Sequence, residues 1–316
     1  MEQMDREIGR LVARNMFIDS HAVAVAERFA HAGIPTILLK GPTLAKWLYD
    51  VADPRFYTDA DVLVPASEMA RAEEILVSLG FVCPHELPHD KPSHAHEWIR
   101  LADRAAIDLH RSLVGAGAPP GKVWDVLSGR TITEDIAGYP VTCLDLEARA
   151  LNVVLHAAAH GPANGKPIED LRRVLQMLAP ERWNIVGDLA QQLDALPAFA
   201  LGLQLCEDGA EVAVRLSLRE PPSVDAILRS SSAPPTSLGI DWLVRLPGWS
   251  KKATFLYHKF FPPREYMLAR HPVARRGRLG LVRAYLWRPL WQLKKFGPAL
   301  RGYVRARRAA RRLDTP

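Results

Sequence analysis

Two aspartates that flank a single alanine, Asp59 and Asp61, have the type and spacing to do chemistry, and they directly precede the apolar run Val62-Leu63-Val64. In an extended strand alternate side chains point to the same face, so the two carboxylates are predicted to lie side by side. Neighbouring carboxylates repel each other, and a divalent cation relieves the repulsion by binding oxygen atoms from both. The pair therefore predicts a metal site on a strand.

A second chemical feature lies upstream, where the string Lys40-Gly41-Pro42-Thr43 interrupts the apolar run of residues 34–39. The run predicts a buried strand, and helical spacing resumes at Leu44. A strand that turns through glycine into a helix directs backbone N–H groups toward one point, which favours phosphate. Pro42 lacks an N–H, so Thr43 and the amides after it must supply more of the phosphate contact. A phosphate site beside a metal site indicates an enzyme that acts on a nucleotide.

The stretch from residue 37 to residue 64 resembles the nucleotidyltransferase superfamily that includes DNA polymerase β. It resembles more closely the uncharacterised bacterial branch of that superfamily. Lys40-Gly41 stands where most of the superfamily carries Gly-Ser, and Arg55, Asp59 and Asp61 have the spacing of the branch. Two later strings extend the resemblance over most of the chain: Ile107-Asp108-Leu109-His110 for a V-D-L-H-like string, and residues 261–267 for F-P-x-x-E-Y-M.

The resemblance implies a metal set of Asp59, Asp61 and Asp108 that holds two Mg²⁺ ions, with Mn²⁺ as a substitute. Three carboxylates offset the mutual repulsion of two ions. One ion then escorts the triphosphate of an NTP, and the other activates the acceptor oxygen for in-line attack on the α-phosphorus. In superfamily members the third carboxylate also assists deprotonation of the acceptor, which assigns that role to Asp108. All three aspartates are thus predicted to be catalytic.

The predicted substrate-binding residues are Lys40, Gly41, Thr43, Arg55 and His110. Lys40 is expected to contact a phosphate oxygen, the alternative being a strand-end lysine with its ammonium in water. Arg55 is either a phosphate contact or half of an ion pair that anchors a loop. His110 shares the strand face of Asp108, which suits a nucleotide contact or a supporting role.

The remaining histidines have weaker patterns. His85, His89, His94 and His96 fit no common zinc spacing and have no accompanying cysteine pair, although alternation allows His94 and His96 to approach the active site. His156 and His160 have i,i+4 spacing without the glutamate of a zinc-protease motif, and are interpreted as polar groups near a helix end.

Composition sets the broad class. A chain of 316 residues with 48% hydrophobic and 24% charged residues has room for a core and for two domains. The sequence shows neither a signal peptide nor a run of about 20 apolar residues, and its three cysteines are widely spaced, so a reduced cytoplasmic protein with no transmembrane segment is expected. The net charge of +6 hides an asymmetry, because residues 264–316 carry 15 Lys and Arg against two acidic residues, or +13, which leaves −7 for the remainder.

Periodicity places these residues on elements. Residues 5–32 predict a helix, 67–79 a second helix, and 97–109 a β-hairpin whose second strand puts Asp108 beside the strand of Asp59 and Asp61. The Gly- and Pro-rich residues 111–143 are interpreted as a linker with short elements. Asp145 is a predicted N-cap, and later helices are expected at 168–178 and 185–217, followed by a loop at 230–235.

The C-terminal segment mixes basic and apolar residues. From Leu279 onward apolar residues recur at helical spacing, with Trp287 and Trp291 nearby, and Pro289 and Pro298 are expected to kink or break the helix. Six arginines follow within residues 301–312. This tail is predicted to be an amphipathic helix packed on the body with solvated arginines, a contact to RNA phosphates, or a helix on an anionic membrane surface.

Together these patterns predict an α+β protein with a polymerase β-like nucleotidyltransferase core, a mixed sheet with helices, and a C-terminal helical domain. The expected parts are an N-terminal helix at 1–32, the catalytic core at 33–140, the helical domain at 141–263 and the basic amphipathic tail at 264–316. The expected reaction transfers a nucleoside monophosphate from an NTP to a small metabolite, sugar phosphate, protein or RNA, with release of pyrophosphate. The alternatives are an RNA-directed, toxin-like nucleotidyltransferase and a non-catalytic module that binds nucleotide or RNA.

Overall fold

The computed structural model forms two compact units. The first, here the N-terminal unit, comprises Met1–Val82, His94–Ala159 and Gly165–Arg219, and the second, the C-terminal unit, is formed mainly by Glu220–Pro316. The described residues are 2–50, 52–84, 94–162, 164–218, 224–231, 233–234 and 236–313. The functional boundaries expected at residues 32, 140 and 263 stay predictions.

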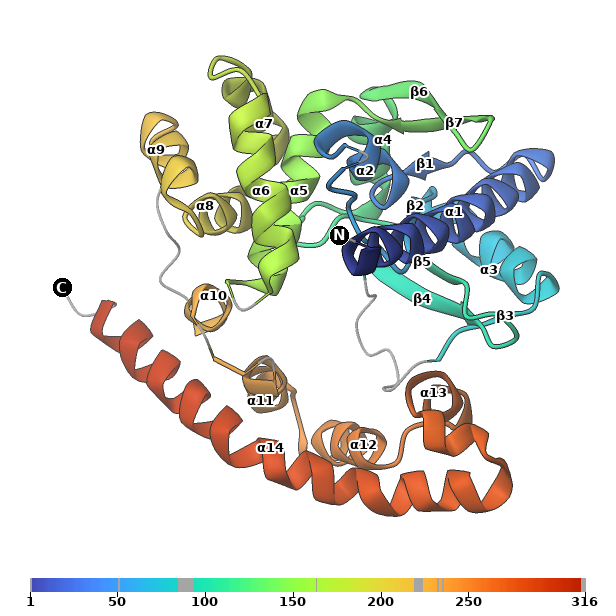
Figure 1. Cartoon of the computed structure of the whole chain (residues 1–316). Helices are drawn as coiled ribbons and strands as arrows, with labels where there is room; N and C mark the ends of the chain where they lie inside the picture. The colour runs from blue at the N-terminus through green and yellow to red at the C-terminus, as the bar shows by residue number, and fades with distance from the viewer. Residues whose placement is uncertain are drawn as a thin grey trace. The chain divides into compact units, whose positions relative to one another are not determined.

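A seven-stranded mixed sheet forms the centre of the N-terminal unit (Figure 1). The strand order is β3-β4-β5-β2-β1-β7-β6, with β2 parallel to β5, β1 parallel to β7 and the other neighbours antiparallel. The strands are β1 Ile37–Leu38, β2 Ala60–Leu63, β3 Phe81–Val82, β4 Ala95–Arg100, β5 Ala106–His110, β6 Thr131–Ile136 and β7 Tyr139–Leu144. A mixed sheet covered by helices confirms the predicted α+β class.

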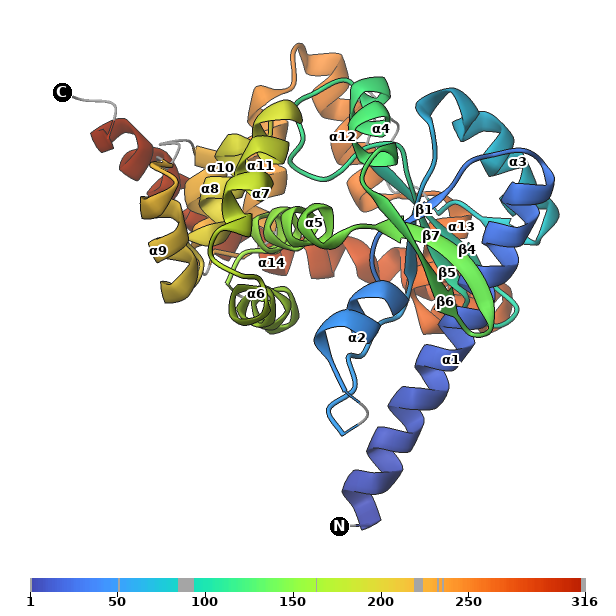
Figure 2. The ribbon, with the colours of Figure 1, turned by 90° about the horizontal axis from the view of Figure 1, so that it is seen from above.

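Helices cover both faces of this sheet. The described helices of the N-terminal unit are α1 Glu2–His31, α2 Pro42–Leu48, the 3₁₀ turn η1 Ala66–Glu68, α3 Met69–Ser78, α4 Pro120–Ser128, α5 Leu146–His160, α6 Gly165–Met177, α7 Arg182–Gln192, α8 Leu196–Leu203 and α9 Glu207–Arg215. Helices α1 and α3 lie on one side of the sheet and α5 on the other (Figure 2). The predicted helices at 5–32 and 67–79 and the hairpin at 97–109 are confirmed, with the hairpin formed by β4 and β5.

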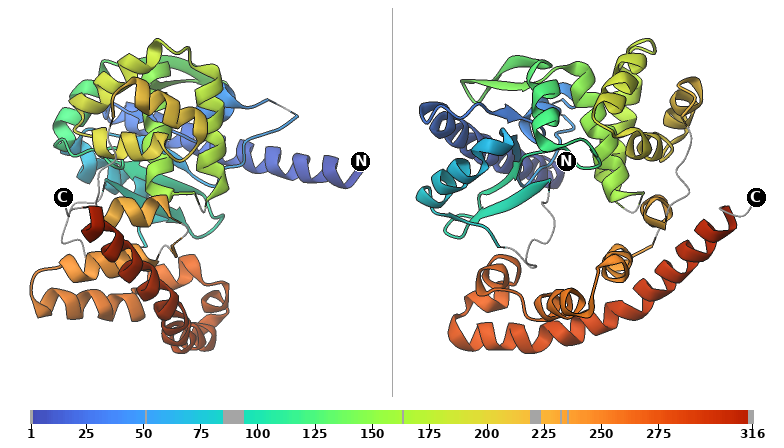
Figure 3. Two further views of the ribbon diagram at one scale, coloured as in Figure 1. Left: turned by 90° about the vertical axis from the view of Figure 1, so that its left-hand side faces the viewer. Right: turned by 180° about the vertical axis from the view of Figure 1, so that it is seen from behind.

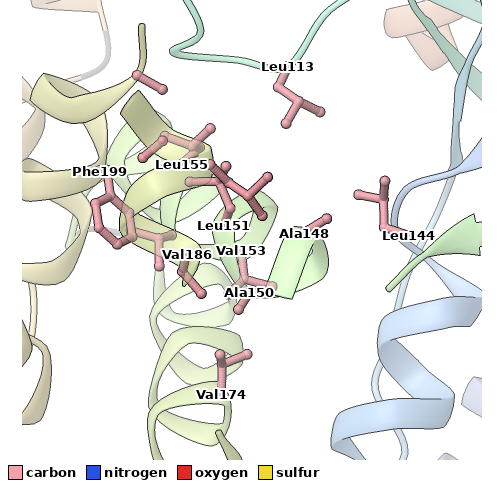
Figure 4. Packing of buried hydrophobic residues seen from close by; sticks show 14 of the residues in the cluster. Leu113, Leu144, Ala148, Ala150, Leu151, Val153, Leu155, Val174, Val186 and Phe199 are labelled. Atoms are coloured by element: carbon pink, nitrogen blue, oxygen red, sulfur yellow. The ribbon is translucent and has the colours of Figure 1, made fainter. Parts of the chain in front are cut away.

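The main core of the N-terminal unit surrounds α5. Leu151 and Leu155 of α5 are fully buried, and Val174, Val186 and Phe199 pack in the same cluster from α6, α7 and α8 (Figure 4). The cluster continues to the sheet through Leu39, Leu63 and Leu144. The predicted N-cap of α5 is confirmed, because Asp145 Oδ1 accepts a hydrogen bond from the Ala148 amide at 3.0 Å.

The prediction of a linker at residues 111–143 is wrong. Pro119 and Pro120 begin α4, and residues 131–144 form the hairpin β6–β7, whose strand β7 pairs with β1 through Leu38 and Cys143. Proline is well suited to the first turn of a helix, and Gly138 adopts a φ of 83° in the hairpin turn. The Gly and Pro residues therefore end and begin elements here instead of preventing them.

The C-terminal unit is helical (Figure 3). Its elements are α10 Val224–Ser230, α11 Thr236–Arg245, α12 Trp249–Phe260, α13 Arg264–Arg270, the 3₁₀ turn η2 Pro272–Arg275 and α14 Gly277–Leu313. Among the described residues, no helix combines the length and apolar content needed to cross a membrane. The loop expected at 230–235 falls between α10 and α11, and residues 232 and 235 of it lie outside the described residues.

Helix α14 bears on two expectations for the C-terminal segment, the break at the prolines and the packing of the arginine-rich stretch. It continues through Pro289 and Pro298 without a break and curves along its length (Figure 1). A proline in a helix interior costs about 3 kcal/mol, and we attribute the continuity to packing against the neighbouring helices. The C-terminal arginine-rich stretch packs on neighbouring helices, as in the first of its three predicted arrangements, because Tyr303 and Ala306 are buried in a cluster with Leu228 of α10 and Ile240 of α11.

Candidate active site

Two carboxylates meet where strands β2 and β5 run in parallel. The register pairs Asp61 directly with Asp108 and Leu63 with His110, so both members of each pair lie on one face of the sheet. Ligand atoms of Asp61, Asp108 and His110 all lie within 4.8 Å of one another. Asp108 thus lies beside the strand of the two aspartates, as the hairpin pattern predicts.

Asp59 lies just before β2 and outside that compact group. It is nevertheless close enough to interact electrostatically, because burial first and the Asp61 carboxylate second raise the pKa of Asp59. Its backbone touches the turn upstream: a Cβ on Gly41 would lie 3.1 Å from the Asp59 carbonyl oxygen. Gly41 also has a φ of 74°, so only glycine fits this turn without strain.

Asp61 is buried and receives two donors on one oxygen. Lys40 Nζ lies 2.7 Å from Asp61 Oδ1, and His110 Nε2 lies 3.0 Å from the same atom. Burial alone would raise the pKa of this carboxyl, but the Lys40 ammonium and the His110 contact outweigh burial and hold the pKa well below its usual range. Asp61 is therefore ionised at neutral pH.

Asp108 has the opposite electrostatic environment. Burial, followed by the charges of Asp61, Asp59 and Glu97, raises the pKa of Asp108 well above its ordinary value. Glu97 contributes because it pairs with Asp108 across the β4–β5 register. Two carboxylates of one site thus have their pKa values pushed apart, which is the pattern that separates acid and base roles in enzymes.

Lys40 connects this site to helix α5. Its ammonium is buried, and besides Asp61 it contacts His156 Nδ1 at 3.3 Å. Lys40 therefore does not have its ammonium in water, which was the alternative to a phosphate contact. The i,i+4 spacing of His156 and His160 gave no indication that His156 reaches this lysine.

Arg55 forms the ion pair that was one of its two predicted roles. Its Nε and Nη2 donate to the two carboxylate oxygens of Asp170 at 2.9 and 2.7 Å, and Tyr49 donates its hydroxyl to Asp170 Oδ1 at 2.7 Å. Both Arg55 and Asp170 are buried. This bidentate pair ties the loop before β2 to helix α6, while a phosphate contact by Arg55 stays a prediction.

Thr43 is fully buried, and its hydroxyl donates to the Leu39 carbonyl at 3.3 Å. The hydroxyl thus stabilises the turn between β1 and α2. Assignment of Gly41 and Thr43 to the triphosphate stays a prediction.

Lys166, at the start of α6, brings a further positive charge toward the site. Although the residue as a whole is exposed, the protein around its ammonium lowers the pKa of Lys166 to about 8, first by desolvation and then by the charge of Arg55. Asp59 and Asp61 act in the opposite direction on it, which shows that the ammonium lies within electrostatic reach of both. Sequence analysis did not identify this residue.

The other predicted histidines lie at the edge of this region. The rings of His94 and His110 are 5.6 Å apart, whereas His96 Nδ1 lies 2.7 Å from Glu73 of α3. His94 therefore approaches the site, and His96 is held at α3. His85 and His89 lie outside the described residues.

A divalent metal ion fits this donor set. Asp61 and Asp108 offer hard oxygen atoms within reach of one another. The charge of Lys40 lowers the pKa of all three aspartates, yet the pKa of Asp59 and Asp108 stays raised, which indicates an excess of negative charge. His110 faces Asp61 with Nε2 and the Ser112 carbonyl with Nδ1, which orients that carboxylate. The residues that would hold the ion are Asp61 and Asp108, with Asp59 adjacent.

Comparison with known proteins identifies a matching protein family. A family model described as uncharacterised nucleotidyltransferase matches residues 1–209. The F-P-x-x-E-Y-M string at 261–267 lies beyond the matched residues. No curated protein matches the chain.

Several solved structures show a distant likeness. The antibiotic-resistance factor ANT(2'')-Ia has 19% identity and a TM-score of 0.40, over 56% of this chain and 96% of that chain. A nucleotidyltransferase-like protein from Paracoccidioides brasiliensis has 14% identity and a TM-score of 0.39, over 64% and 93%. The lincosamide antibiotic adenylyltransferase LnuA has 15% identity and a TM-score of 0.34, over 48% and 91%. At TM-scores below 0.5 these likenesses assign neither substrate nor mechanism.

Proposed function

The chain belongs to the uncharacterised nucleotidyltransferase family, and we propose that it uses Mg²⁺ to transfer a nucleoside monophosphate from an NTP to an acceptor hydroxyl or phosphate. In this reaction an acceptor oxygen bonds to the α-phosphorus, the bond between the α-phosphorus and its bridging oxygen breaks, and pyrophosphate leaves. The observation that carries the proposal is the direct pairing of Asp61 with Asp108 on parallel strands, with Asp59 within electrostatic reach of Asp61.

The two paired aspartates have different roles in this proposal. Asp61 and Asp108 hold the metal, and Asp59 completes the set from the end of the preceding loop. Bound Mg²⁺ would neutralise triphosphate charge and activate the acceptor oxygen. Asp108, whose raised pKa gives it the higher proton affinity, takes the proton of the acceptor hydroxyl. His110 keeps Asp61 oriented by contacting its Oδ1.

The positive side chains divide into two groups. Lys40 and Lys166 both lie within electrostatic reach of the aspartates, and we assign them to the triphosphate, whose negative charge they offset. Arg55 is held by Asp170, so its main role is to fix the loop that leads into β2. Binding of triphosphate and metal would shift the Lys40 ammonium from Asp61 Oδ1 toward a phosphate oxygen.

The acceptor class is tested with α-labelled NTPs. Purified protein and Mg²⁺ are incubated with each of the four nucleotides, separately with total RNA, total protein and small metabolites from cells. Label in one fraction identifies the acceptor class. Asp61→Asn should abolish the labelling, and Asp188→Asn, a matched change of an exposed aspartate on α7, should leave it unchanged.

The outcomes separate the remaining alternatives. Label confined to RNA would establish the RNA-directed reaction, and label in small metabolites would establish a metabolite-modifying enzyme. Nucleotide binding without label in any fraction, by protein whose melting temperature is normal, would overturn the proposal in favour of a non-catalytic binding module.

A further inference from the structure

Helix α14 of the C-terminal unit buries small residues and exposes large ones. On the face packed against the other helices, Ala284, Ala299, Ala306 and Ala310 are all buried. On the exposed side a series of large apolar residues recurs at steps of three, four or seven positions, which places them on one face of the helix. These residues, here the apolar stripe, are Leu279, Val282, Leu286, Leu290, Leu293, Leu300 and Val304.

The apolar stripe is exposed to a degree that is unusual for leucine. Leu279, Leu286 and Leu290 are 86, 71 and 65% exposed. Single exposed leucines need no explanation, but a continuous row of them marks a surface that another apolar phase covers. The row adjoins an apolar groove of about 310 Å³ between α11, α12 and α14, which Leu243, Phe255 and Phe296 help to line.

Basic and aromatic residues border the apolar stripe on one side. Arg283, Lys294, Arg301 and Arg305, here the basic row, each directly follow a member of the stripe, so they lie about 100° further around the helix. All four are exposed. Trp287 and Trp291 follow Leu286 and Leu290 in the same way, with their rings 6.4 Å apart.

The charge of α14 has one sign throughout. Residues 277–313 contain eleven Lys and Arg and no Asp or Glu. An apolar face bordered by arginine, lysine and tryptophan is the arrangement of helices that lie in the plane of a membrane surface, where tryptophan occupies the headgroup level. Anionic lipid headgroups supply the negative charge that the helix itself lacks.

We infer that α14 docks the protein on an anionic phospholipid surface, with the apolar stripe entering the headgroup boundary and the basic row contacting lipid phosphates. RNA would satisfy the basic row by phosphate contacts, but it gives aliphatic leucines and valines no apolar partner. A second copy of the chain would cover the stripe only by bringing two unrelieved rows of positive charge together. The membrane surface satisfies both features at once.

The test is sedimentation of the full-length protein with vesicles of phosphatidylcholine alone or mixed equally with phosphatidylglycerol. The wild type should bind the anionic vesicles, bind the neutral ones far more weakly, and dissociate as salt is raised. The triple change Arg283→Gln, Lys294→Gln and Arg301→Gln should weaken binding about a hundredfold, since each basic residue contributes about fivefold. The triple change Leu286→Gln, Leu290→Gln and Leu293→Gln should weaken it by about tenfold or more.

The matched control is the triple change Met16→Gln, Val77→Gln and Val214→Gln, at exposed apolar positions of the N-terminal unit. It should change vesicle binding by less than about twofold. Circular dichroism must show that each variant keeps its helix content. Equal binding of wild type and both triple variants would overturn the inference. Binding to an RNA oligonucleotide but not to vesicles at the same salt would overturn it in favour of RNA, and loss of self-association in the leucine variant without vesicle binding would overturn it in favour of a second copy.

Discussion

The two units of this protein use apolar and charged residues in opposite ways. In the N-terminal unit Leu151, Val186 and Phe199 are fully buried, and the interior also holds paired charges, as in Arg55 with Asp170 and Lys40 with Asp61. In the C-terminal unit α14 buries alanines, leaves leucines in solvent and surrounds them with positive charge.

The difference shows that an apolar side chain is not always part of a core, so an exposed row of apolar residues needs an explanation other than folding. The N-terminal unit has a core large enough to hold buried ion pairs, and their fixed geometry suits a reaction site. The exposed leucines of α14 contribute little to folding, so their presence indicates a contact made outside the unit. One unit thus has the features of a catalyst and the other those of a docking surface.

The largest expected effect is on the reaction. Asp61→Asn should reduce nucleotidyl transfer by about a hundredfold or more, because it removes a metal ligand without changing side-chain volume. Thermal unfolding should show an intact fold, since asparagine still accepts a hydrogen bond from Lys40 or His110. Asp59→Asn should cause a comparable loss, and turnover near that of the wild type in that variant would remove Asp59 from the metal set.

The same substitution in the two units sharpens the comparison. Leu151→Ala in the N-terminal core should lower the free energy of unfolding by about 2–5 kcal/mol, because a fully buried leucine leaves a cavity. Leu290→Ala on α14 should change it by less than about 0.5 kcal/mol, because this side chain is already in water. Urea unfolding measures both, and equal losses would contradict the assignment of Leu290 to a surface.

An intermediate effect is expected in the pH dependence of stability without metal. The raised pKa of Asp108 means that the folded protein binds the carboxyl proton more tightly than the unfolded chain does. The contribution of this proton to the free energy of unfolding is therefore complete below about pH 4 and is lost as the pH rises through the pKa of the folded state. In EDTA the melting temperature of the wild type should therefore fall more than that of Asp108→Asn as the pH rises from about 4.

Two controls belong to that comparison. Asp61, whose pKa is depressed, loses its stabilising ionisation only on acidification below the chosen range. Mg²⁺ should reverse the trend in the wild type, since binding the cation favours the ionised carboxyl. Parallel melting curves for the two proteins in EDTA would show that Asp108 does not titrate as described.

The smallest expected effect concerns Lys166. Lys166→Gln should raise the KM for NTP about two- to fivefold at pH 7, a size typical of a partly exposed charge contact. Because the pKa of Lys166 is lowered to about 8, the wild-type side chain loses its charge above that pH and the difference from the variant should narrow. Lys122→Gln, a matched change of an exposed lysine on α4, should leave the KM for NTP unaltered. A KM difference between wild type and Lys166→Gln that does not change with pH would contradict the assignment of Lys166 to the triphosphate.

Much of the site was predictable because it lies on strands. Alternation along Asp59, Ala60 and Asp61, and again along Asp108 and His110, predicts side-chain direction from spacing alone. The register of β2 with β5 confirms that Asp61 lies beside Asp108, whereas Asp59 precedes β2 and lies outside their group. The family resemblance drawn from the same residues is confirmed by the family model over residues 1–209.

The site residues and elements that the sequence did not predict depend on contacts between distant segments of the chain. Asp170, His156 and Lys166 come to the site from α5 and α6, more than 100 positions after Arg55, Lys40 and Asp59, and no local pattern distinguishes them. The β6–β7 hairpin was missed because its glycines and prolines also fit a linker. Helix α14 runs through two prolines because tertiary packing outweighs their local cost.

The most direct test of the account compares α-labelled with γ-labelled NTP in the same Mg²⁺-containing reaction with cell extract. A nucleotidyltransferase moves the α-phosphorus to the acceptor and releases the γ-phosphorus in pyrophosphate. We predict acceptor labelling from the α-labelled nucleotide only, with loss of that labelling in Asp61→Asn and retention in Asp188→Asn. Acceptor labelling from the γ-labelled nucleotide, or α-labelling that survives Asp61→Asn, would contradict the account.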